Sequence, residues 1–216
     1  MQLEPIHISF TGGTRGEYLS AIVYTAYFGK LPTYEINDDG KMRIRHEKQI
    51  TKLHKEVCHF DRVDRVPKKH LIRTFFKKRK PFIGISHYAA QLQYLLDEDF
   101  DRNCYVVKIL QKTPVVVIEH DEDDIPIIAM QSSKKNRERS FEELVHRKDI
   151  RWLRNCKSYF NNFAYVHYKD LTTNLPKVLN IISSHTGHKL EYNDCTEILQ
   201  KEYIEKNKIY GVDDRT

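Results

Sequence analysis

Residues 5–28 read PIHISFTGGTRGEYLSAIVYTAYF, and this stretch decides the fold. Residues 6–10 have the apolar character of a short buried strand. Residues 11–16, TGGTRG, form a turn with three glycines, and residues 17–28 carry apolar side chains at helical spacing. A strand, a glycine-rich turn and a helix in this order can hold a phosphate. Glycines let the backbone come close, and the N–H groups of the helix N-terminus face the anion.

The side chains of the turn add further donors to this candidate anion site. Two threonine hydroxyls can donate hydrogen bonds, and Arg15 can offer a charged fork. The candidate binding residues are therefore Thr11, Gly12, Gly13, Thr14, Arg15 and Gly16. The turn is neither a Walker A loop nor a G-x-G-x-x-G fingerprint. The alternative interpretation is a turn whose glycines only let a helix pack tightly on a strand.

The sequence TGGTRGEYL resembles the 5'-phosphosulfate-binding loop of the sulfotransferases, especially the heparan-sulfate enzymes. Residues 12–15 match the Gly-Gly-Thr-Arg form of that loop, and Leu19 matches an apolar position after it. The family's catalytic lysine falls on Thr11, which can donate a hydrogen bond but carries no charge. Residues 168–171, Tyr-Lys-Asp-Leu, resemble the family's Tyr-Glu-Asp-Leu.

This resemblance implies a fold and an activity. It implies an α/β fold with a P-loop-type parallel sheet and helices on both faces. The donor would be 3'-phosphoadenosine 5'-phosphosulfate, and the acceptor would be a hydroxyl or amine of a small molecule or saccharide. Ser86 and His87 look similar to a pair that follows a strand in many sulfotransferases. His87 and Arg15 are the candidate catalytic residues, with His87 as the base; the alternative is a strand-end histidine that only hydrogen-bonds locally.

The family usually holds the 3'-phosphate with an Arg-Asp-Pro segment and a later serine, and this chain departs from that pattern. Residues 119–124 read EHDEDD instead, and an acidic cluster repels phosphate. The 3'-phosphate would then be held elsewhere, with Ser132, Ser133, Lys134 and Lys135 as the candidates, or the usual donor would not be used. The alternative interpretation is that this acidic run is only the solvated start of a helix.

Composition predicts one domain over residues 1–216, with a charged insert around 37–66 and a polar linker around 131–140. The formal net charge of +6 favours anionic ligands but does not separate nucleotide, sulfated sugar and nucleic acid. Nucleic-acid binding rests only on that charge and on the basic run 77–80, without a recognised motif.

Cysteine usage and the N-terminus predict the compartment. The four cysteines show no C-x-x-C spacing, which predicts reduced thiols and no zinc site. No signal peptide and no membrane span are expected. Since Golgi sulfotransferases carry an anchor, the sequence favours a bacterial or viral relative in the cytoplasm, the host cytoplasm if viral.

The remaining chain predicts alternating strands and helices. An Asp-Gly turn indicates a hairpin over residues 34–45. Residues 46–65 are expected to be a solvated helix followed by a loop, and their histidines and cysteine fit no common metal site. Further strands are predicted over 81–88, 105–110, 114–118 and 163–168, and helices over 121–130, 174–185 and 195–210.

Three functions stay open on the sequence. The first is the sulfotransferase-like enzyme described above, without a metal. The second is a non-catalytic structural or binding protein on the same fold, such as a phage or virion component, which Thr11 and the acidic run favour. The third is a nucleotide or sugar-phosphate kinase, against which the missing Walker lysine counts. An oligomer is compatible with each of them.

Overall fold

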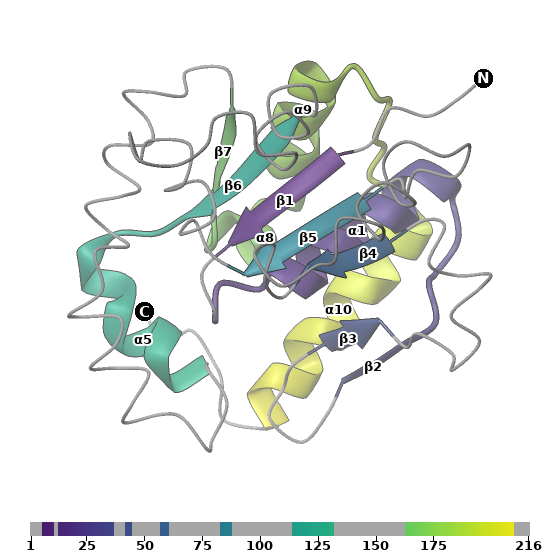
Figure 1. The fold of residues 1–216 in the computed structure, drawn as a ribbon. Coiled ribbons are helices and arrows are strands. Elements are labelled where there is room, and N and C mark those ends of the chain that lie inside the picture. Colours follow the sequence, from purple (N-terminus) through teal and green to yellow (C-terminus); the bar gives the residue numbers. More distant parts are fainter. Residues whose placement is uncertain are drawn as a thin grey trace, which may run out of the picture.

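In the computed structural model, the described residues are 6–10, 13–36, 42–44, 57–60, 83–87, 114–131 and 163–209. Five parallel strands form the main sheet in the order β4-β5-β1-β6-β7 (Figure 1). Their bounds are Ile6–Phe10 for β1, Val57–Phe60 for β4, Ile83–His87 for β5, Val115–Glu119 for β6 and Ala164–His167 for β7. The predicted α/β fold with a parallel sheet is confirmed.

The strand that precedes the glycine-rich turn, β1, lies at the centre of the sheet. The chain passes from β1 to the edge strand β4, returns to β5, and then crosses to β6 and β7. The connection that leaves β1 therefore leads toward the β4 edge of the sheet, whereas the connection that leaves β6 leads toward the β7 edge. In open parallel sheets, ligands bind at the carboxyl ends of the strands where this direction reverses.

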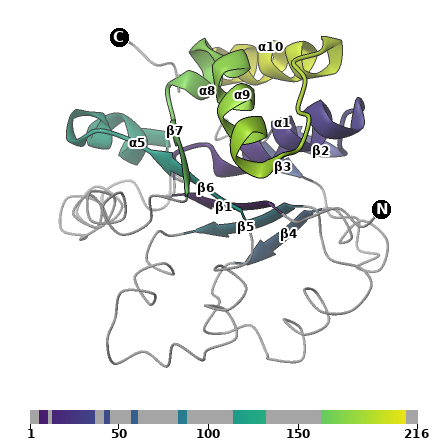
Figure 2. The ribbon, with the colours of Figure 1, turned by 90° about the horizontal axis from the view of Figure 1, so that it is seen from above.

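The helices α1, α8, α9 and α10 cover one face of the sheet (Figure 2). Their bounds are Gly16–Phe28 for α1, Asp170–Thr173 for α8, Leu175–Thr186 for α9 and Asp194–Ile209 for α10. A 3-10 turn at Glu122–Asp124 and helix α5, Ile125–Gln131, follow β6. Helices are thus confirmed on one face. Between β4 and β6, the structure describes only β5 and Pro114. The predicted strand 105–110 therefore lies outside the described part of the chain.

The core forms between the sheet and α1. All five residues of β1 are buried, as expected for a central parallel strand. Ile6, Ile8 and Phe10 belong to the main hydrophobic cluster together with α1. Helix α10 packs on α1, where the rings of Tyr18 and Tyr203 stack with their centroids 4.0 Å apart.

The predicted hairpin is confirmed as β2, Tyr34–Ile36, and β3, Met42–Ile44, which pair antiparallel. The hydroxyl of Tyr34 donates a hydrogen bond to the carboxylate of Glu202 on α10. Burial and this carboxylate raise the pKa of Tyr34 well above its usual range. The hairpin is thereby tied to the helical layer.

The prediction for residues 46–65 is wrong, because they contain the strand β4. Val57 pairs with Ile83, and the four residues of β4 extend the sheet beyond β5. A strand this short is stabilised by pairing with a partner far along the chain. The composition of the segment therefore gives little sign of it.

Candidate functional site

The carboxyl ends of β1, β5, β6 and β7 meet at one side of the sheet, called here the carboxyl edge. The register pairs Phe10 with His87 and Glu119 with His167, so all four strands end at a similar level. Phe10, the last residue before the glycine-rich turn, and the backbone of His87 therefore lie next to each other. The side chain of His87 is outside the described part of the structure.

The predicted binding residues are only partly described. Residues 13–16 lie between β1 and α1 at the carboxyl edge. Thr11 and Gly12 precede them and fall outside the described residues. Ser132 and Lys134 follow the end of α5 and also fall outside, so their predicted role in holding a 3'-phosphate stays a prediction.

Two glycines of the turn are required by close packing. Gly13 has a φ of 96°, and a Cβ there would overlap the carbonyl oxygen of Ile128 on α5. A Cβ at Gly16 would overlap the ring of Phe10 at the end of β1. The turn is thus held between β1 and α5, and both positions favour glycine for steric reasons.

Arg15 connects the turn to the segment that follows β7. Its backbone is left-handed, with φ 64°. Its Nη1 donates hydrogen bonds to the carbonyl oxygen of Tyr168, at 3.3 Å, and to Oγ1 of Thr172, at 3.0 Å. Its guanidinium also lies 5.5 Å from the centroid of the Tyr168 ring. The side chain predicted to bind an anion therefore also fastens the glycine-rich turn to α8.

The first turn of α1 presents backbone N–H groups at the same edge. The N–H of Leu19 donates to the carbonyl of Arg15, at 3.0 Å, so the three N–H groups before it precede the i→i−4 ladder of the helix. Such a terminus favours an anion. Thr14 is fully buried beside it, and Glu17 in the first turn partly balances its positive potential.

The acidic run after β6 forms a capped turn, called here the acidic turn, residues 121–124. Asp124 accepts a hydrogen bond from the backbone N–H of Asp121 at 3.1 Å. Its other oxygen lies 2.7 Å from Nζ of Lys169, although the Asp124 side chain is only 3% exposed. Burial alone raises the pKa of Asp124, but the hydrogen bonds and the cation outweigh it, and the pKa lies below its usual range. Asp124 is therefore a carboxylate held ionised by Lys169.

His167 completes a group of three possible metal ligands with the acidic turn. Its Nε2 lies 3.4 Å from Oδ2 of Asp124 and 3.5 Å from Oδ2 of Asp121. The ligand atoms all lie within 4.8 Å of one another, which is compatible with a divalent cation. However, Nδ1 of His167 accepts a hydrogen bond from the backbone N–H of Lys169 at 3.3 Å, which leaves the proton of the neutral ring on Nε2. Since Lys169 also neutralises Asp124, the geometry of these residues favours an ion-pair network over a metal site.

Lys169, Thr172 and the pairing of Asp124 are the site features that the sequence did not predict. One signal was available, because polar residues follow both β6 and β7, and neighbouring parallel strands bring such residues together. The chain also has a lysine at position 169, where the Tyr-Glu-Asp-Leu pattern has a glutamate. Which strands are neighbours depends on the topology, which only the structure supplies.

No family model matches the chain, and no curated protein matches it at a significant level. Within the described ranges, none of the helices is both long and apolar enough to cross a membrane.

Proposed function

We propose that the chain is a sulfotransferase-like protein with a P-loop-type sheet. It would bind 3'-phosphoadenosine 5'-phosphosulfate at the glycine-rich turn and transfer the sulfonate to a hydroxyl or amine. The observation that carries the proposal is the position of this turn. It follows the central parallel strand, opens into a helix N-terminus and lies where the connections of the sheet reverse direction.

The residues at the carboxyl edge suit such a transfer. In-line sulfonyl transfer depends on positioning and on neutralising charge at the leaving and transferring oxygens. The N–H groups of the first turn of α1 would receive the 5'-phosphosulfate. Arg15, already fixed by Tyr168 and Thr172, would hold the turn in its left-handed conformation beside the donor. His87, at the end of the neighbouring strand, would accept the proton of the acceptor.

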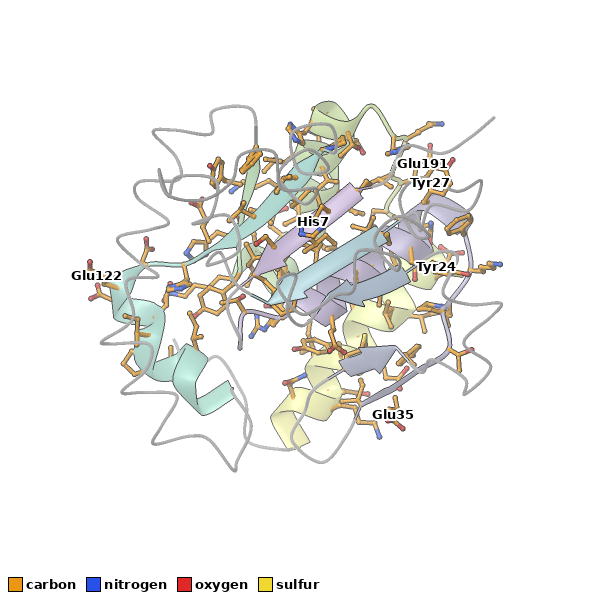
Figure 3. All side chains as sticks on the ribbon, in the orientation of Figure 1. His7, Tyr24, Tyr27, Glu35, Glu122 and Glu191 are labelled. Atoms are coloured by element: carbon orange, nitrogen blue, oxygen red, sulfur yellow. The ribbon has the colours of Figure 1, made fainter. Side chains whose placement is uncertain are left out.

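Calorimetric titration with the desulfated product, 3'-phosphoadenosine 5'-phosphate, tests this proposal. We expect micromolar binding by the wild type, and binding about threefold tighter in Glu17→Gln, which removes a negative charge from the first turn of α1. Glu191→Gln is the matched control, because Glu191 lies at the opposite end of the strands from the acidic turn (Figure 3). Absence of binding in the wild type would overturn the proposal, and tighter binding of ATP would favour a kinase.

A non-catalytic protein on the same fold is the second candidate. Two observations favour it: the carbonyl of Ile128 lies against Gly13, and the acidic turn brings negative charge to the carboxyl edge. This second candidate predicts that the protein forms a stable complex, either with a second copy of the chain or with a partner, and transfers no sulfonate to any acceptor. Incubation with radiolabelled donor and a panel of hydroxyl and amine acceptors separates the two candidates.

A further inference from the structure

Helix α10 lies in the same layer as α8 (Figure 2) and is hydrogen-bonded to it at the residue that contacts Arg15. Nε2 of Gln200 on α10 donates a hydrogen bond to the backbone carbonyl of Thr172 at 2.8 Å. Nη1 of Arg15 donates to Oγ1 of the same threonine at 3.0 Å. Thr172 therefore links α10 to the glycine-rich turn, because its carbonyl accepts one bond and its hydroxyl accepts the other.

The direction of these hydrogen bonds is defined by their neighbours. The hydroxyl of Thr172 donates to the carbonyl of Lys169 at 3.2 Å, so its oxygen is left to accept from Arg15. The amide of Gln200 is used at both ends, since its Oε1 accepts from the hydroxyl of Tyr192 at 3.0 Å. A reversed amide would place two acceptor oxygens against each other at Thr172. Gln200 is therefore held in the one orientation that donates to α8.

Helix α10 is itself firmly placed at the end that carries Gln200. The N–H of Thr196 donates to Oδ1 of Asn193 at 3.0 Å, and the N–H of Asn193 donates to Oγ1 of Thr196 at 2.8 Å, which caps the helix. Thr196 is fully buried, and Tyr203 stacks on Tyr18 of α1. Gln200 lies between these two positions on the same side of the helix. It is thus presented to α8 from a helix that packs on α1.

Arg15 is the residue that needs this support, because its left-handed backbone is costly for a residue with a Cβ. We propose that Gln200 and Thr172 are positioning residues for the glycine-rich turn, and that α10 thereby sets the affinity of the α1 N-terminus for the 5'-phosphosulfate of the donor. This inference rests on the proposed function. The bond to Thr172 offsets part of the cost of the left-handed backbone, so the first N–H groups of α1 are in place before the anion arrives.

Thr173 offers a matched control for Thr172. Oγ1 of Thr172 and Oγ1 of Thr173 both donate to the carbonyl of Lys169, at 3.2 Å and 3.0 Å. Of the two hydroxyls, that of Thr172 is the one that accepts from Arg15. Thr172→Val and Thr173→Val therefore remove the same bond to Lys169, and the first also removes the contact with Arg15. Gln200→Met keeps the length of the side chain and removes its bonds to α8 and to the hydroxyl before α10.

The first test is calorimetric titration of these variants with 3'-phosphoadenosine 5'-phosphate. We expect binding about fivefold weaker in Thr172→Val, about threefold weaker in Gln200→Met and unchanged in Thr173→Val. The two losses should not add in the double variant Thr172→Val/Gln200→Met, since Arg15 is already released in the first. Additive losses would overturn the inference. Tighter binding by Thr172→Val would also overturn it, because the contact would then withhold Arg15 from the anion.

A second test uses the protein without nucleotide. The N–H of Leu19 donates to the carbonyl of Arg15 at 3.0 Å, so its hydrogen exchange, followed by NMR, reports on the backbone of Arg15. We expect exchange about threefold faster in Thr172→Val and Gln200→Met, and at the wild-type rate in Thr173→Val.

The two tests distinguish failure of the inference from failure of the proposed function. Wild-type binding with unchanged affinity in Thr172→Val and Gln200→Met would overturn the inference alone. A wild type that binds no nucleotide would overturn the proposed function. The exchange of Leu19 then tests the positioning by itself, with faster exchange in both variants supporting it and an unchanged rate overturning it.

Discussion

His7 lies in the middle of the sheet, on the central strand β1 (Figure 3), and its side chain is almost completely buried. Desolvation lowers its pKa from 6.5 to about 4. The folded protein therefore binds a proton at this residue less readily than the unfolded chain does. Stability from this group is fully present above pH 6.5 and declines as the pH falls toward 4.

We predict that the free energy of unfolding decreases by about 2 kcal/mol from this residue alone between pH 7.5 and pH 5. Urea unfolding of the wild type and of His7→Gln at the two pH values measures it. The variant should be less stable at pH 7.5 but should lose less stability on acidification. Equal losses in both proteins would show that His7 does not titrate in this way.

Individual residues also mark the limit of what the sequence predicts about the site. The glycine-rich turn and the polar end of β5 are visible in the sequence, because each belongs to the end of a strand with a clear apolar pattern. The proximity of His87 to this turn and the contacts of Arg15 and Lys169 are not visible, since each depends on a residue from a segment that is distant in sequence. Such contacts depend on which strands are neighbours, and no local pattern encodes that order.

At the scale of elements, the packing of α1 on β1 positions the turn. Helix α1 begins at Gly16, where only a hydrogen fits against the ring of Phe10. Gly29, at the other end of α1, has φ 64° and open space around its missing Cβ. The two glycines therefore serve different purposes, one steric and one conformational.

We predict that Gly16→Ala lowers the free energy of unfolding by about 3 kcal/mol, because the methyl group must displace Phe10 or α1. Gly29→Ala should cost about 1 kcal/mol, the usual penalty of a left-handed alanine. Chemical denaturation of the two variants provides the comparison. A smaller loss for Gly16→Ala than for Gly29→Ala would contradict the close packing of α1 on β1.

The elements also show why part of the fold could be predicted. Strands β1, β5, β6 and β7 and helices α1, α9 and α10 were predicted because each carries its own periodicity or cap, such as Gly187 after α9. Strand β4 was assigned to a helix and loop, and α8 was not predicted. Both are four residues long, and β4 depends on pairing with β5, which is distant in sequence.

At the scale of the whole molecule, the sheet brings together loops that are far apart in the chain. The glycine-rich turn, the acidic turn and the segment 167–172 all reach the carboxyl edge from different strands. Arg15 joins the first of these to the third, and Lys169 joins the third to the second. A ligand bound at the turn should therefore affect all three segments together.

The central claim, that an adenosine bisphosphate binds at the glycine-rich turn, is tested most directly by amide hydrogen exchange. We predict that 3'-phosphoadenosine 5'-phosphate slows exchange in residues 13–18 and, through Arg15 and Lys169, in residues 167–172. Residues 187–193, which lead from α9 to α10 and include Glu191, should not change (Figure 3). Binding without protection of residues 13–18 would contradict the account, because the nucleotide would then be held elsewhere.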